Sequence, residues 1–346
     1  MSILHGAGPL IAALFCLHAP AAVSADRIKI STGPEAGAQP AMARDIARFV
    51  GPAAGLDIEV QSANGPAESL QRLLDVAGVR LALLPSDTAF AYADAARRGN
   101  ADASRLLAPV RVIATLHREP IYLIVRADSP FSSAQDIRDA RINAGPLASG
   151  SALTATTLYR LLFEAPIADD RISFLDHEEA LARLTGDRSI DVVIMVAEQP
   201  ARLLANMKPE ARRFIRLLKF DAAAPSAAAA LRLYDATSVH AASYPNLLDE
   251  DLPALATTVY LVTYGPRRAE DDARLARLAR AWCKQLPRMQ AEGNPLWREA
   301  ALAPAELKPE WHYATTAADE LAACSGAAPL PTATCSQQER VLGLCR

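Results

Sequence analysis

Short runs rich in β-branched residues alternate with segments of helical periodicity from residue 26 onward. The first half has extended runs at residues 28–30, 57–61 and 79–84, separated by helical patterns at 41–50 and 67–74. Strands connected through helices build a parallel sheet from βαβ units. The alternation therefore predicts an α/β fold with mostly parallel sheets flanked by helices.

The same alternation of extended and helical segments occurs in the second half, with extended runs near residues 141–144, 172–175 and 190–196. A helical segment of the form E-x-L-x-R-L precedes a buried strand in both halves, ESLQRL ending at Leu73 and EALARL ending at Leu184. Two matching α/β lobes explain this similarity, and chance likeness between amphipathic helices is the alternative. The chain has 346 residues, of which 51% are hydrophobic, so it is long enough for two cores.

Two long extended segments are not followed at once by a loop and a helix. The run at residues 121–125 leaves the first lobe, and the run TTVYLVTY at 257–264 returns to it, which predicts a two-strand hinge. Lobe I then takes residues 26–118 and 257–325, and lobe II takes residues 119–256. Residues 326–346 form a C-terminal tail.

The first 25 residues have the pattern of an export signal. Residues 7–17 are almost wholly apolar or small, and AAVSA at 21–25 is a typical cleavage site. The apolar run is too short to span a bilayer, and no later stretch reaches about 18 uninterrupted apolar residues. We expect cleavage after residue 25 and a soluble protein in the periplasm.

Charge and motif content argue against several function classes. A net charge of −3 and an aromatic content of 5% give no support for nucleic acid or anionic lipid as a partner. The four histidines after residue 25 show no HExxH spacing, and no GxSxG motif occurs. We therefore expect a protein that is not an enzyme and has no cofactor or metal. His117 lies near the first hinge segment, where a hinge or surface position is favoured over a place in the cleft.

Four polar junctions follow predicted strands and open predicted helices. They are residues 31–35 (STGPE), 85–87 (PSD), 146–151 (PLASGS) and 197–200 (AEQP). In open α/β sheets, ligands bind beyond the carboxyl ends of the strands. Two such junctions in each lobe, with a hinge between the lobes, predict a cleft that closes on a small solute.

The third junction has two interpretations. Ser149 and Ser151 stand just ahead of a helical segment that starts at Leu153, beside Gly150. Serine is a good helix N-cap, and glycine allows a tight bend. The same free N–H groups and hydroxyls attract anions, so the loop is either a capped turn or a ligand site.

The chain resembles the extracytoplasmic solute-binding subunits of the TAXI type, which serve TRAP transporters. The similar stretches are IKISTGPEAG (28–37), LALLPSDTAFAYADA (81–95), EPIYLIVRADSPFSSAQDI (119–137) and RINAGPLASGSALTATTLY (141–159). The resemblance covers about residues 27–300 and implies a type II periplasmic-binding-protein fold that captures a small organic anion. The binding roles that it implies fall on Ser31, Thr32, Gly33, Ser86, Asp87, Pro146, Ser149, Gly150 and Ser151, with Asn64 a weaker candidate.

Two acidic residues depart from the family pattern. Glu35 stands in the first loop, and Glu198, followed by Gln199, stands in the last loop, where the family usually has glycines. We include all three residues in the predicted binding set. Carboxylates at the cleft would repel a dianion. A ligand that also carries a positive amine would be less disfavoured. The alternative is that both carboxylates point into water.

Four cysteines remain after the signal: Cys283, Cys324, Cys335 and Cys345. Ser336–Glu339 has the form of a capping box, so a helix is expected from about residue 337 to 345. Cys335 and Cys345 would lie about 15 Å apart along it, too far for a disulfide. We favour Cys324–Cys335 with Cys283–Cys345, and the alternative is Cys283–Cys335 with Cys324–Cys345.

The sequence thus predicts a periplasmic receptor for a small organic acid or amino acid, monomeric, that delivers its solute to a TRAP-type permease. The alternatives are an enzyme acting on a small carboxylate, or a ligand sensor without a permease.

Overall fold

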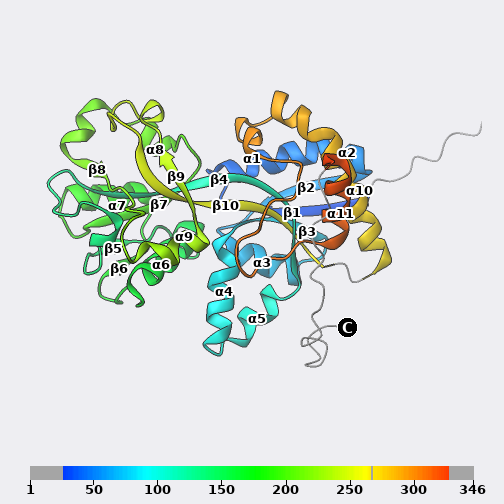
Figure 1. Ribbon diagram of the computed structural model, residues 1–346, viewed down its shortest axis with the longest axis horizontal. Coiled ribbons are helices and arrows are strands. Elements are labelled where there is room, and N and C mark those ends of the chain that lie inside the picture. Colours follow the sequence, from blue (N-terminus) through cyan, green and yellow to red (C-terminus); the bar gives the residue numbers. More distant parts are fainter. Residues whose placement is uncertain (1–25, 266–267, 327–346) are drawn as a thin grey trace, which may run out of the picture.

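The structure is a computed structural model that describes residues 26–265 and 268–326. The predicted signal peptide, the helix expected at residues 337–345, Cys335 and Cys345 lie outside the described residues. Two α/β lobes lie side by side along the long axis, and the strands β4 and β10 run from one into the other (Figure 1). Among the described helices, none is long and apolar enough to cross a membrane.

Lobe I is the half built on three parallel strands, β1 (Asp26–Thr32), β2 (Leu56–Ser62) and β3 (Val79–Pro85). They lie in the order β2-β1-β3, and β10 (Leu252–Tyr264) follows, antiparallel to both β3 and β4 (Val110–Arg126). The helices of lobe I are α1 (Ala38–Asp45), α2 (Gly51–Ala54), α3 (Pro66–Asp75), α4 (Asp87–Arg97), α5 (Ala101–Leu107), α10 (Ala269–Glu292) and α11 (Thr315–Ser325).

Local sequence explains the helices that follow β1 and β2 in lobe I. The predicted helix at 41–50 is longer in the structure, because a π-helical turn (Ile46–Val50) joins α1 to α2. Helix α3 begins at Pro66, a position where no backbone N–H is needed, and it buries Leu70 and Leu73. The core of lobe I also includes Trp282 of α10, packed edge-to-face on Trp297 with ring centroids 5.5 Å apart. Trp297 lies in a 3₁₀ turn (Pro295–Glu299).

Lobe II is the half built on β5 (Ile142–Asn143), β6 (Ile172–Ser173) and β7 (Val192–Val196), which are parallel in the order β7-β5-β6. Apolar clusters cover both faces of this sheet, which accounts for the unbroken apolar run VVIMV of β7. The remaining elements are α6 (Gly150–Phe163), α7 (His177–Thr185), α8 (Arg202–Ala205), α9 (Ala227–Leu233), β8 (Ile215–Leu217), β9 (Asp235–Val239), and 3₁₀ turns at Ala134–Asp136, Pro209–Arg213 and Ala241–Ser243.

The two predicted hinge segments are parts of β4 and β10. Strand β4 has 17 residues; its first part pairs with β10, and Ile121–Val125 pair with β7 of lobe II. Strand β10 pairs with β9 through Leu252–Ala256 and with β3 through Val259–Thr263. Each strand therefore belongs to both lobes, as the sequence predicts for a two-strand hinge.

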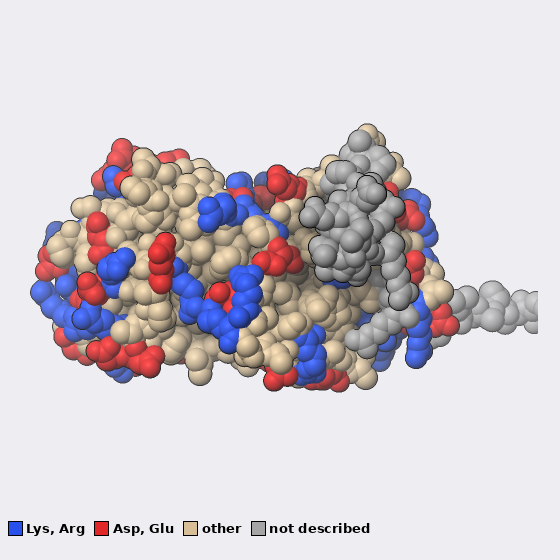
Figure 2. Space-filling model, turned by 60° about the horizontal axis from the view of Figure 1, so that its bottom comes forward, with Lys and Arg blue, Asp and Glu red and all other residues tan. Residues whose placement is uncertain are grey.

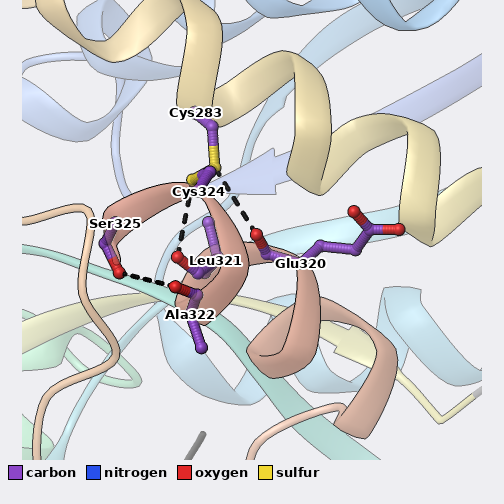
Figure 3. Close-up of a disulfide and its surroundings, with 6 residues drawn as sticks. All are labelled: Cys283, Glu320, Leu321, Ala322, Cys324 and Ser325. Atoms are coloured by element: carbon purple, nitrogen blue, oxygen red, sulfur yellow. Dashed lines mark hydrogen bonds between the residues drawn. A yellow bond between two sulfur atoms is a disulfide. The ribbon is translucent and has the colours of Figure 1, made fainter. Parts of the chain in front are cut away.

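The disulfide prediction is wrong. Cys283 of α10 is bonded to Cys324 of α11, with Cα atoms 6.3 Å apart (Figure 3). This bond contradicts both pairings that the sequence argument retained. Both predicted pairings require all four cysteines to pair within the chain, and α11 is not among the predicted helices. Because α11 packs along α10, the two cysteines that precede the tail reach each other directly.

Candidate functional site

A cavity of about 850 Å³ lies between the lobes. Its wall includes residues at or just after the carboxyl ends of β1, β3, β5 and β7, namely Gly33, Pro85, Pro146 and Ala197. This is the position at which open α/β sheets bind ligands. On the face drawn in Figure 2, acidic and basic side chains intermix rather than gather in a patch of one sign. Because the cavity lies at the carboxyl ends of the strands of both lobes, it is the candidate ligand site.

Four helices of both lobes begin at the wall of this cavity. Its lining includes Gly37 and Ala38 at the start of α1, Gly65 and Pro66 at α3, Ser149–Ser151 at α6, and Asp176–Glu178 at α7. Helices α1, α3 and α7 have no side-chain hydrogen bond at the N-cap. Free N–H groups and the helix dipole make these ends partly positive. Together they favour the anionic group of a ligand, and they do so most at α1 and α6, because Asp176 and Glu178 add negative charge at the start of α7.

At the first junction, Gly33 lines the cavity, and its N–H donates to Oε1 of Gln39 over 2.9 Å. Ser31 and Thr32 are fully buried beneath it; Ser31 shares a hydrogen bond with Ser69 over 2.9 Å between the two Oγ atoms. Neither of the two lines the cavity. Because Ser31 and Thr32 are buried in the core, only Gly33 of these three predicted residues is placed to contact a ligand in the cavity.

Glu35 and Asn64, two further residues of the predicted set, lie at the surface rather than in the cavity wall. Glu35 accepts hydrogen bonds from Ser62 and Arg44, and these two partners hold the pKa of its carboxyl below the usual range. Asn64 donates to Oε2 of Glu68 over 2.8 Å. Of the two acidic departures from the family pattern, Glu35 is thus the one that points into water.

The second junction is buried between the lobes. Oδ2 of Asp87 accepts from Thr154 over 2.6 Å and from Tyr234 over 3.0 Å, and both donors belong to lobe II. Ser86 shares a hydrogen bond of 3.0 Å with Thr257 of β10. Desolvation raises the pKa of Asp87 to about 6, which outweighs the opposing hydrogen bonds. Asp87 therefore ties the two lobes together, whereas Ser86 links its own lobe to β10, and neither residue lines the cavity.

At the third junction, Pro146, Ser149, Gly150 and Ser151 all line the cavity. Ser149 is the N-cap of α6, and its Oγ accepts from the N–H of Ala152 over 3.1 Å. Oγ of Ser151 accepts from the N–H of Val196 over 3.0 Å. Each hydroxyl still has a hydrogen to donate. The capped turn that the sequence predicts thus forms, and the same loop remains available to a ligand.

The lobes touch at this loop. A Cβ atom added to Gly65 of lobe I would stand 2.1 Å from the carbonyl oxygen of Ala148 and 2.9 Å from Cα of Ser149. Only glycine fits at such a backbone approach. The backbone of Gly65, just before α3, therefore packs directly on the Pro146–Ser151 loop at the wall of the cavity.

At the fourth junction, Glu198 lines the cavity, and Gln199 does not. Oε1 of Gln199 accepts from the N–H of His240 over 3.0 Å. Burial raises the pKa of Glu198, and its own backbone N–H is the strongest opposing influence. The charge of nearby Glu119 adds to the rise.

Sequence reasoning missed Glu119 and His177 of the wall. Glu119 lies in β4, and its Oε1 accepts from Gln39 over 3.3 Å. His177 opens α7; its Nε2 has no hydrogen-bond partner among the described residues, and burial lowers its pKa. The stretch LDHEE at residues 175–179, after the strand at 172–173, is a fifth polar junction that could have indicated His177.

His117, left open between the hinge and the cleft, is buried in β4, with Nε2 3.3 Å from Oε1 of Glu119. It therefore contacts a cavity residue from behind the wall. Within residues 26–265 and 268–326, no group of three or more His, Cys, Asp and Glu side chains is arranged to hold a metal ion.

Comparison with known proteins gives one family match. A family model described as the NMT1-like family matches residues 30–290. Among curated proteins, no significant match is found.

Several solved structures are similar to this chain. They include XAC2383 from Xanthomonas citri bound to ATP, with 13% identity over 87% of this chain and 96% of that one and a TM-score of 0.44. The arginine-, lysine-, histidine-binding protein ArtJ from Geobacillus stearothermophilus has 13% identity over 79% of this chain and 99% of that one, with a TM-score of 0.44. The Candida albicans CA3427 product, described as having the generic periplasmic binding protein fold, has 11% identity over 87% and 91%, with a TM-score of 0.44.

Proposed function

The chain belongs to the NMT1-like family, and from its fold and cavity we propose that it is a receptor that binds a small organic acid or amino acid between its lobes. The observation that carries the proposal is the cavity of about 850 Å³ at which four helices of both lobes begin. Ligand pockets have volumes of about 300–1,000 Å³ and combine apolar walls with a few placed polar groups. Leu83, Met195 and Leu203 supply apolar surface here.

The helix N-termini favour a ligand with an anionic group. The N–H groups of α1 and α7 have no side-chain cap, and the hydroxyls of Ser149 and Ser151 each retain a donor hydrogen. Arg202 also lies in the wall and adds a positive charge. Helix N-termini and hydroxyl donors of this kind bind carboxylates.

The proposal includes an extracytoplasmic site of action and a membrane partner. The export-signal pattern of residues 1–25 supports release into the periplasm, and the resemblance to TAXI-type subunits supports delivery to a TRAP-type permease. The receptor acts as a monomer whose lobes, with boundaries at residues 118/119 and 256/257, close about β4 and β10.

A screen of melting temperature against small organic acids and amino acids tests the receptor role. A ligand that binds the native state raises the free energy of unfolding by RT ln(1 + [L]/Kd), which is about 2.7 kcal/mol at a hundredfold excess over Kd. We expect at least one compound to stabilise the protein and to make it more compact in solution scattering. Lack of stabilisation by every compound, or turnover of a compound by the pure protein, contradicts the proposal.

A further inference from the structure

Of the four acidic residues in the cavity wall, Asp176 and Glu178 are exposed, whereas Glu119 is buried and Glu198 is half-buried. Glu119 projects from β4 with a side chain that is 10% exposed, and Glu198 follows β7. Among the described residues, no Lys or Arg forms an ion pair with either of them. Arg202, the basic residue in the described part of the wall, is exposed and pairs with neither.

The protein's own side chains satisfy Glu119 poorly. Its Oε1 accepts from Gln39 and contacts Nε2 of His117, both over 3.3 Å, which is long for a hydrogen bond. Its Oε2 has no hydrogen-bond partner within residues 26–265 and 268–326. A carboxylate that is nine-tenths buried and uses one oxygen on two long contacts leaves the other oxygen available to a ligand in the cavity.

Glu198 brings a second negative charge to the same place. Ile121 of β4 pairs with Val196 of β7, and the N–H of Ala197 donates to the carbonyl oxygen of Pro120, so that Glu198 follows beside Glu119 in the wall of the same cavity. The charge of Glu119 helps to raise the pKa of Glu198, and His117 and the backbone N–H of Ala38 at the start of α1 act in the opposite direction. Neither of these neighbours is a fixed positive charge. Two close carboxylates without a cation are unfavourable in a half-buried cavity, and a positively charged group of the ligand would remove the repulsion.

We propose that Glu119 and Glu198 form a subsite for a protonated amine, so that the receptor selects zwitterionic amino compounds over plain carboxylic acids. The inference rests on the proposed receptor function and narrows its ligand class. The ligand's carboxylate binds at the helix N-termini and the Ser149–Ser151 loop. Its ammonium group donates to the free oxygen of Glu119 and to Glu198, through charge-assisted hydrogen bonds. Glu119 and Glu198 are then the residues that determine specificity.

The test compares matched ligand pairs that differ in one amine: L-glutamate with glutarate, L-aspartate with succinate, and L-alanine with propionate. Affinities are measured by calorimetric titration for the wild-type chain and for Glu119→Gln, Glu198→Gln and Glu35→Gln. Glutamine has nearly the shape of glutamate, but it carries no charge and has an NH2 donor in place of one carboxylate oxygen. Glu35→Gln is the matched control, because Glu35 lies at the surface outside the cavity wall.

We expect the wild-type chain to bind the amino member of at least one pair tenfold to a hundredfold more tightly, the range for a hydrogen bond to a charged group. Glu119→Gln or Glu198→Gln should reduce this preference at least tenfold, and Glu35→Gln should leave it unchanged. Equal or tighter binding of the plain acids by the wild-type chain overturns the amine subsite and leaves the receptor function standing. A preference that both cavity variants retain also overturns it. Failure of all six compounds to bind, together with a negative screen, contradicts the receptor function itself.

Discussion

Asp87 and the pair Glu119 and Glu198 are buried or half-buried carboxylates at the junction of the two lobes, but their surroundings differ. Asp87 is fully buried and accepts from Thr154 and Tyr234, so that hydroxyl groups of lobe II surround a carboxylate of lobe I. Glu119 and Glu198 face a cavity, and Glu119 has two long contacts on one oxygen.

The difference separates a structural carboxylate from one that is available to a ligand. Where the protein supplies donors to a buried charge from both lobes, the group holds the lobes together. Where the hydrogen bonds to a carboxylate are long or few, a ligand can supply the missing donors. Changes near Asp87 should therefore alter stability, and changes in the cavity wall should alter ligand binding.

The largest expected change in stability comes from a site remote from both carboxylate regions. Replacing Cys283 and Cys324 by serine opens a bond between residues 41 apart, for which chain entropy predicts a loss of about 3–4 kcal/mol. Denaturant unfolding of the oxidised protein measures this loss, and ligand affinity should stay unchanged. Non-reducing peptide mapping should find the Cys283–Cys324 peptide. Free thiols at both positions, or equal stability of the double variant, would contradict the pairing.

The titration of Asp87 should make the free energy of unfolding depend on pH. The folded-state pKa of Asp87 is about 6, above the usual unfolded value of about 3.9, so the folded state binds more protons between these values. The free energy of unfolding should therefore rise as the pH falls from about 7 to about 4, by up to about 3 kcal/mol from this group.

Asp87→Asn should remove that contribution, because asparagine does not titrate. Unfolding of both proteins at pH 7.5 and pH 5 measures it, and the wild-type gain should exceed the variant's by more than about 1 kcal/mol. Equal gains in both proteins would show that Asp87 is ionised at little cost in the fold. Selectivity between amino acids and plain acids should be the same in both.

Ser149→Ala and Ser151→Ala test the cavity side of the comparison. Each removes a hydroxyl that can donate to an anion, and a hydrogen bond to a charged group contributes about 1.5–3 kcal/mol, so affinity should fall about tenfold to a hundredfold. Ser149→Ala should also lose about 1 kcal/mol of stability, because Ser149 caps α6. Ser31→Ala is the matched control, since Ser31 is buried outside the wall. Full affinity in both cavity variants would mean that the loop is a capped turn without a role in ligand binding.

Gly65→Ala tests the contact between the lobes at the cavity. A Cβ atom there would clash with the carbonyl oxygen of Ala148, so the lobes cannot meet as they do in the structure. Overpacking of this kind costs about 1–3 kcal/mol, and ligand affinity should fall by up to about a hundredfold. Gly265→Ala is the control, because its nearest neighbour would be 3.5 Å away. Equal affinity of Gly65→Ala and wild type would mean that ligand binding does not need this contact.

Much of the fold could be predicted from the sequence, because strand and helix patterns alternate clearly and the two hinge segments are long and apolar. The site was harder to predict. Ser31 and Gly33 are two residues apart in one polar junction, yet one faces the core and the other the cavity. The side on which a residue falls at the end of a strand depends on where the strand ends and on what packs against it, which composition does not reveal.

Glu119 and the disulfide were missed for related reasons. Glu119 lies at the start of EPIYLIV, an apolar stretch that indicates a strand and conceals that its first residue faces the cavity. The Cys283–Cys324 bond depends on α11 folding back along α10 after a connection with little regular structure. Both features follow from contacts between segments far apart in the chain, and a local pattern does not contain them.

The most direct test of the account is a crystal structure of the protein with the compound that stabilises it most in the screen. The account predicts the compound in the cavity between the lobes, with its anionic group at Ser149–Ser151, at the start of α6, and an amine at Glu119 and Glu198. A compound bound elsewhere, for example in the small cavity of lobe I beside Arg80 and Arg274, would contradict it.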